Sequence, residues 1–180
     1  MLDKLLGIFV YFLIVACLVV IHEIGHYMFG RMLGIPKDKM TFGIQKMTPH
    51  VALMNDNLEK IPPSNLDAYV PILEKHLKSD FHMFLFAIGG HLTELIGVFT
   101  LILLSFVINS SGLTFIAKSV AWIAPLLALN YLLMDCITSY RRGAPSGGDF
   151  SGSWSISQKG AYLFYGFYFF FLLSAVFLTR

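Results

Sequence analysis

The chain has 180 residues, of which 56% are hydrophobic and only 13% are charged. A soluble domain is usually about a quarter charged, so this composition argues against a soluble protein and indicates a membrane protein. The formal net charge of +2, with no block of Lys and Arg, argues against nucleic acid as a partner. At this length we expect a single domain, residues 1–180.

Four segments have the roughly 20 apolar residues that a membrane helix needs. They span about 5–33, 81–108, 115–137 and 161–178. The first begins after Lys4, but it leads straight into HEIGH without a small-residue cleavage pattern, so we interpret it as a retained transmembrane helix rather than a signal peptide. The sequence therefore predicts an all-α polytopic membrane protein with about four transmembrane helices.

The first loop, residues 35–80, is the only long polar stretch. Residues 40–54 alternate loosely in polarity and break at Thr48-Pro49, which predicts a short hairpin. The following stretch predicts an amphipathic helix on the membrane surface, because apolar residues recur at helical spacing at Leu66, Val70, Leu73 and Leu77. The second loop, 138–158, is rich in Gly and Ser, and we expect it to be irregular.

Positive charge gives the orientation. With four crossings, the loops 31–80 and 138–159 lie on one side and hold ten Lys and Arg residues, against three on the other side. Because cytoplasmic loops carry an excess of Lys and Arg, we predict a multi-pass protein of the cell membrane with both loops in the cytoplasm.

The sequence HEIGH ends the first apolar segment. His22 and His26 are four residues apart, so they share one helix face and can bind one Zn²⁺. Glu23 lies beside them, where it can take a proton from a water at the zinc and pass it to a leaving amine. Ionisable groups in a membrane segment are costly unless they face an interior or a cavity. The alternative is a structural hydrogen-bonded cluster of His and Glu.

A catalytic zinc usually has three protein ligands, and the third must come from elsewhere in the chain. The candidates near the other helices are His91, Glu94, Asp135 and Asp149. Asp149 is favoured because it lies in PSGGDFSG, where glycines let the backbone approach a site closely. Asp135 has a simpler interpretation, as a solvated residue or a partner of Arg141. His91 and Glu94 stay open as a rival source of ligands.

The sequence HEIGHYMFGRMLGIPKDKMTFGI resembles the opening of the site-2 protease family of intramembrane zinc metalloproteases. The matching positions are Gly25, Arg31, Gly34, Ile35, Phe42 and Gly43. Asn130 and PSGGDF resemble the family's later motif, which implies that Asp149 is the third metal ligand. The resemblance covers most of the chain, but only its first part is specific. It implies a minimal core without the accessory peptide-binding domain of larger relatives.

Two departures from the family are visible. Asp149 is followed by Phe150 where the family commonly has Gly, and GGHLTEL stands where the family often has Gly-Pro-x-x-Asn. His91 therefore replaces the Pro and Glu94 replaces the Asn. For substrate binding, the resemblance points to Asn130, Glu94, His91 and Gly43, the last on a hairpin that is thought in the family to pair with an extended substrate strand. A plain surface loop is the alternative for that hairpin.

These observations predict an intramembrane zinc endopeptidase whose substrate is a membrane-spanning peptide or protein in the lipid bilayer. Recognition would come from the core itself, from a membrane partner or from a homo-oligomer. The alternatives are an HExxH endopeptidase with Glu94 as third ligand, and a non-catalytic metal-binding or immunity-type membrane protein. We expect Gly89 and Gly90 to serve mainly helix packing, and Cys17 and Cys136 to be buried.

Overall fold

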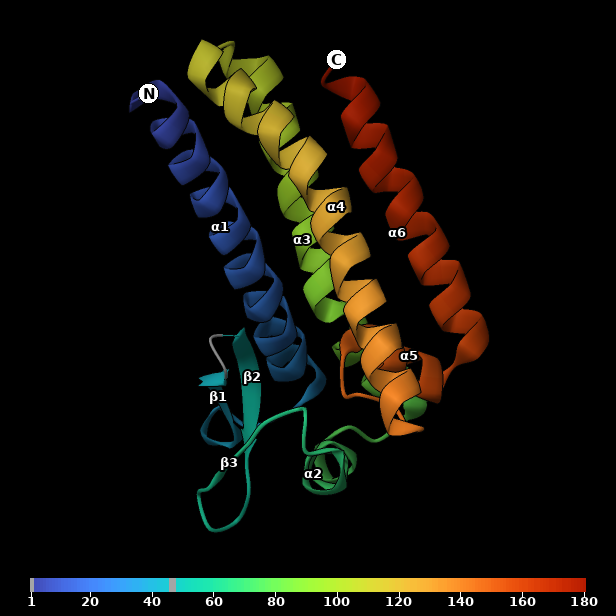
Figure 1. Cartoon of the computed structure of the whole chain (residues 1–180). Helices are drawn as coiled ribbons and strands as arrows, with labels where there is room; N and C mark the ends of the chain where they lie inside the picture. Colours follow the sequence, from blue (N-terminus) through green and yellow to red (C-terminus); the bar gives the residue numbers. More distant parts are fainter. Residues whose placement is uncertain (1, 46–47) are drawn as a thin grey trace.

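The computed structural model describes residues 2–45 and 48–180 and is mostly helical (Figure 1). A small sheet follows the first helix, and two short helices lie among the long ones. The elements in chain order are α1 (Leu2–Leu33), a 3-10 turn (Lys37–Lys39), β1 (Met40–Gln45), β2 (Thr48–Met54), β3 (Lys60–Ile61), α2 (Leu66–His76), α3 (Asp80–Ile108), α4 (Ser111–Arg142), α5 (Asp149–Ile156) and α6 (Gln158–Leu178).

Four helices of the described chain, α1, α3, α4 and α6, are long and apolar enough to cross a membrane, as the sequence predicts. The helix α4 extends beyond the expected 115–137 at both ends and contains Pro125. Two features stabilise the C-terminal end of α4. Arg141 and Arg142 lie in the last turn, where cations interact favourably with the helix dipole, and Gly143 ends the helix in the left-handed conformation.

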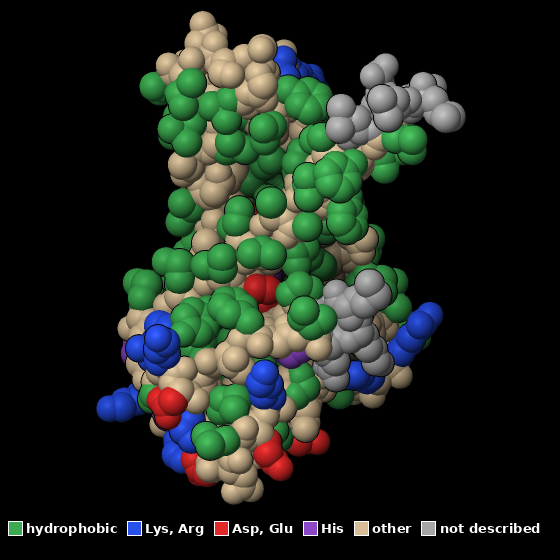
Figure 2. Space-filling model, turned by 90° about the vertical axis from the view of Figure 1, so that its left-hand side faces the viewer, with side chains coloured by type: hydrophobic (Ala, Val, Ile, Leu, Met, Phe, Trp, Pro, Cys, Tyr) green, Lys and Arg blue, Asp and Glu red, His purple; other side chains and the backbone are tan. Residues whose placement is uncertain are grey.

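The helices pack through a core of buried residues from α1, α3, α4 and α6. The helix α4 contributes mainly small side chains, which allow close approach of membrane helices: Ala117, Ala121, Ala124 and Ala128. Figure 2 shows many hydrophobic side chains on the visible side of the long helices, whereas most of the charged side chains in this view lie at the lower end of the molecule. Cys17 and Cys136 are exposed, so the expectation that both are buried is wrong. An apolar context does not signal burial when lipid covers the surface.

The predicted hairpin is present. Strands β1 and β2 are antiparallel, with Phe42 opposite Val51 and Ile44 opposite Pro49. The expected break at Thr48-Pro49 is wrong, since both residues belong to β2. Strand β3 adds only to Leu53 and Met54, on the other side of β2. The outer edge of β1 therefore has no partner strand among the described residues.

The remaining loop predictions are partly confirmed. The amphipathic helix is α2, which buries Tyr69 and Leu73 against the sheet and the start of α3. The second loop is not irregular throughout, because α5 forms within it. Figure 1 shows both termini and the α3–α4 turn at one end of the molecule, and the sheet, α2 and α5 at the other. Both loops thus lie on one side, as four crossings require; the assignment of that side to the cytoplasm stays a prediction.

Candidate metal centre

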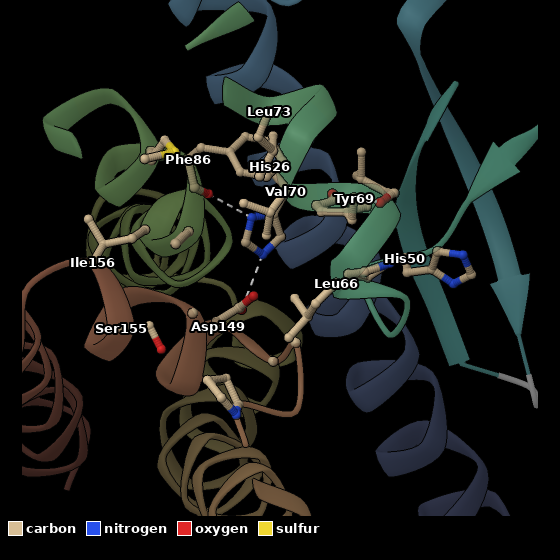
Figure 3. A pocket seen from close by; sticks show the side chains of 18 of the residues that line it. His26, His50, Leu66, Tyr69, Val70, Leu73, Phe86, Asp149, Ser155 and Ile156 are labelled. Atoms are coloured by element: carbon tan, nitrogen blue, oxygen red, sulfur yellow. Dashed lines mark hydrogen bonds and ion pairs between the residues drawn. The ribbon is translucent and has the colours of Figure 1, made fainter. Parts of the chain in front are cut away.

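His22 and His26 share the inner face of α1, as their spacing predicts. Both side chains are buried, and their Nε2 atoms are 3.2 Å apart. Asp149, the first residue of α5, approaches them from the far end of the sequence. Its Oδ2 lies 2.7 Å from Nε2 of His22 and 3.1 Å from Nε2 of His26. Figure 3 shows His26 and Asp149 pointing toward one another. The structure thus brings together the three residues favoured from sequence.

The charge state of Asp149 suits this position. Burial alone would raise the pKa of its carboxyl, but His26 and His22 in their protonated forms outweigh burial and hold that pKa well below its usual range. The side chain is therefore an ionised acceptor at neutral pH.

Asp135 holds α5 in place. Its Oδ2 accepts a hydrogen bond of 2.7 Å from the backbone N–H of Ser151, and its Oδ1 accepts one from the hydroxyl of Ser146. The carboxylate thereby satisfies an N–H of the first turn of α5, which has no partner within the helix. A β-carbon on Gly148 would lie 2.6 Å from this carboxylate, so the glycine permits the approach. Asp135 is buried, and the expectation of a solvated or Arg141-paired residue is wrong.

His91 and Glu94, both buried on α3, lie on different sides of the histidine cluster. The Nε2 of His91 faces the cluster, 3.6 Å from Oδ2 of Asp149. Glu94 lies behind it, with Oε2 3.5 Å from the other ring nitrogen, Nδ1, of His22. One donor atom each from His22, His91 and Asp149 lie within 4.8 Å of one another, close enough to hold one metal ion. His91 and Asp149 are therefore neighbours at one site rather than rivals.

The hydrogen-bond partners indicate which ring nitrogens carry protons. The Nδ1–H of His26 donates to the backbone carbonyl of Phe86 at 2.9 Å, so in the neutral ring Nε2 carries no proton. The Nε2 of His22 is hydrogen-bonded to Asp149, and its Nδ1 lies 3.5 Å from the Glu94 carboxylate. With a metal bound, the proton of the neutral His22 ring would be on Nδ1, toward Glu94, and Nε2 would be bare. Two lone pairs and a carboxylate that face one another repel, and a divalent cation between them turns repulsion into binding.

Gly90 provides the space for such an ion. A β-carbon at this position would lie 2.5 Å from Nε2 of His26 and 2.6 Å from Nε2 of His22. The missing side chain thus leaves room beside the nitrogens, where a ligated zinc lies about 2.0–2.1 Å from each. Gly89 behaves as expected for packing, since its β-carbon would meet the ring of Phe29. Gly90 was also expected to serve helix packing, but in the structure it lies against the ring nitrogens of His22 and His26.

Two cavities meet at the cluster. The α2 cavity has a volume of about 440 Å³ and is mostly apolar; its lining includes Glu23, Tyr69, Leu73, Phe86 and Ile156 (Figure 3). The α4 cavity, about 210 Å³, is lined by His22, His91, Tyr131, Leu132 and Tyr168, among others. Glu23, His50 and Asp149 line both. The half-buried Glu23 therefore lies at the junction of the two cavities.

The structure does not bring Asn130 to the site. Asn130 is exposed on α4 and lines neither cavity; its neighbour Tyr131 lines the α4 cavity instead. Gly43 lies in β1 opposite His50, and its missing side chain makes room for the His50 ring. His50 lines both cavities. The hydroxyl of Tyr168 donates a hydrogen bond to Glu94. The sequence does not predict this role, because nothing in the aromatic run YGFYFFF distinguishes one ring from another.

Comparisons with protein-family models, curated proteins and solved structures give no match to this chain.

Proposed function

We propose that the protein is an intramembrane zinc endopeptidase. The observation that carries the proposal is the convergence of the Nε2 atoms of His22 and His26 with the Asp149 carboxylate around the space left by Gly90. Two histidines and one carboxylate are a donor set of catalytic zinc. The resemblance of HEIGHYMFGRMLGIPKDKMTFGI to the site-2 protease family supports the same reaction.

A bound zinc would polarise the scissile carbonyl and lower the pKa of a water molecule. Glu23 would do the proton transfer: it lies next to His22 in sequence and at the junction of both cavities. As a carboxylate it takes a proton from the attacking water, and as an acid it returns that proton to the leaving amine.

The substrate would be a membrane-spanning peptide or protein, cut inside the bilayer near the end that carries the sheet. Arg31, the basic residue in the last turn of α1, lies nine positions after His22, which is about 14 Å of helix at 1.5 Å per residue. A peptide bond is accessible at that depth only after the substrate helix unwinds, and each freed backbone group then needs a partner. The outer edge of β1 offers such partners. The positive-charge count places this end in the cytoplasm.

A second candidate is a non-catalytic metal-binding membrane protein. The nearness of His91 to Asp149 favours it, because metal sites closed by four protein donors are usually structural. An endopeptidase with Glu94 as third ligand has less support, since Glu94 faces the Nδ1 side of His22, away from the Nε2 atoms.

The experiment combines metal analysis with cleavage. Purified protein in detergent should carry about one zinc per chain, and His22→Ala, His26→Ala and Asp149→Ala should each lose most of it. Glu23→Gln should keep the zinc but lose cleavage of a reconstituted transmembrane peptide, because an amide is not a base. His76→Ala is the matched control: His76 ends α2, lines neither cavity and should change nothing.

The outcomes separate the two functions. Zinc retention in all three ligand variants would refute the metal centre. Zinc binding with no Glu23-dependent cleavage of any membrane peptide would favour the non-catalytic function. Equal cleavage of soluble unstructured peptides and membrane peptides would refute the intramembrane assignment.

A further inference from the structure

We propose that His91 is a fourth protein donor to the same ion, so that the centre binds its metal through three imidazoles and one carboxylate. This inference rests on the metal centre of the proposed function, but it does not depend on proteolysis.

The position of His91 supports direct contact with the ion. Its side chain is buried on α3, one residue beyond Gly90. Its ring centroid lies 4.6 Å from that of His22, in an edge-on arrangement. Its Nε2 lies 3.6 Å from Oδ2 of Asp149, the oxygen that also faces His22 and His26. Two ligands of one tetrahedral zinc are typically separated by about this distance, given metal–ligand bonds of roughly 2.0–2.2 Å.

A chain of hydrogen bonds fixes the tautomer of His91. The hydroxyl of Tyr168 donates to Oε2 of Glu94 at 3.1 Å. Because its proton is used in this way, the Tyr168 oxygen is an acceptor toward Nδ1 of His91, which lies 3.3 Å away. The proton of the neutral imidazole is therefore on Nδ1, and the bare Nε2 presents its lone pair to the cluster. A proton on Nε2 instead would have pointed at the place of the ion.

Glu94 completes the electrostatics. Its side chain is 1% exposed and lies in the membrane-spanning part of α3, where an ionised carboxylate is costly without a compensating charge. Its Oε2 faces the Nδ1 atoms of both His22 and His91, at 3.5 and 3.7 Å. A divalent cation with Asp149 and Glu94 has no net charge when all three imidazoles are neutral. One buried carboxylate thus orients two ligands and balances the charge of the ion.

A four-donor set has a consequence for the reaction. Hydrolysis would require either a fifth ligand position or the withdrawal of His91 when water and substrate enter. The zinc would be held more tightly than by three donors. In every catalytic cycle, His91 would either stay bound beside a fifth ligand or leave the zinc and return.

The test counts imidazoles directly. Zinc X-ray absorption on the full-length protein in detergent should report three imidazoles in the wild type and two in His91→Ala. Histidine-selective ¹⁵N NMR of the wild type gives the same answer without a variant: the Nε2 signals of three histidines should shift when zinc is added. Zinc affinity, measured by competition with a chelator, should fall in His91→Ala.

Tyr168→Phe tests the chain of hydrogen bonds. Loss of the hydroxyl removes the acceptor for Nδ1 of His91, and loss of such an outer partner typically costs about 10–100-fold in metal affinity. Tyr165→Phe is the matched control, because Tyr165 also packs on the His91 ring but its hydroxyl bonds neither His91 nor Glu94 among the described residues. Its affinity should equal that of the wild type.

Two results would overturn the inference. One is a wild-type spectrum with two imidazoles, and the other is a His91→Ala protein with unchanged affinity; either leaves the proposed function standing if Glu23-dependent cleavage persists. A wild-type protein that binds no zinc would refute the inference and the proposed function together.

Discussion

A β-carbon on Gly90 would lie 2.5 Å from the Nε2 atom of His26. Real β-carbons essentially never make contacts this short. While His26 keeps its place, position 90 therefore accommodates glycine and no residue with a β-carbon. The ring of His26 cannot turn away without losing the hydrogen bond from its Nδ1–H to the Phe86 carbonyl. The glycine and the histidine are therefore coupled, and the space between them is where the proposed metal would bind.

Gly90→Ala should abolish zinc binding, because the new methyl group occupies the place of the ion. Zinc content after dialysis against a weak chelator, measured by atomic absorption, checks this. Gly97→Ala, two turns further along α3, should bind zinc like the wild type, since its β-carbon would make only an ordinary contact of 3.7 Å with Ile21. Wild-type affinity in Gly90→Ala would show that the ion binds elsewhere.

Asp135→Ala should weaken zinc binding without touching a ligand. The change leaves the Ser151 N–H without its acceptor, which costs about 1–3 kcal/mol and loosens the start of α5, where Asp149 lies. We expect about a 10–100-fold loss of zinc affinity, as for other outer partners of ligands. Arg142→Ala is the control: it removes an exposed hydrogen bond to the Ser146 carbonyl in the same loop and one of two cations in the last turn of α4, and zinc affinity should be unchanged. Equal affinities in both variants would refute the positioning role.

Ile44→Pro should reduce cleavage while the zinc content stays unchanged. The Val51 carbonyl accepts from the Tyr69 hydroxyl, so the backbone groups of Val51 face away from β1. In an antiparallel pair the opposite residue, Phe42, then faces outward on its own side, as does Ile44 two residues on. Proline at Ile44 therefore removes an outer-edge N–H and spares the hairpin.

The expected loss of cleavage is about fivefold, the effect of one hydrogen bond of about 1 kcal/mol. Ile44→Val, which keeps the N–H, should cleave normally in the same assay with a transmembrane peptide. Unchanged cleavage by Ile44→Pro would rule out strand addition at this edge and leave the metal centre unaffected.

Reporter fusions should fix the orientation. A reporter after Arg180 should be extracytoplasmic, and one inserted at Asn57, in the exposed connection between β2 and β3, should be cytoplasmic. The reason is the excess of Lys and Arg at the end that carries the sheet. The opposite pattern would place the metal centre near the other face of the membrane.

The sequence by itself determined the elements that depend on local pattern. Apolar runs of about 20 residues predict membrane helices because the bilayer demands that length, and all four are present. The spacing of His22 and His26 places both on one helix face whatever surrounds the helix. The hairpin and α2 likewise follow from alternation and helical spacing within short stretches.

Only the tertiary structure decided which distant groups join His22 and His26. Asp149 is 127 residues from His22, and no periodicity links such positions. The sequence favours Asp149 over Asp135 as a ligand but assigns Asp135 no structural role; in the structure Asp135 holds α5, and Asp149 faces the histidines. Asn130 and Tyr131 differ by one position, which is 100° around a helix, and only the latter lines a cavity. Packing of α3, α4 and α5 sets these rotations, because side-chain direction depends on how whole helices fit together.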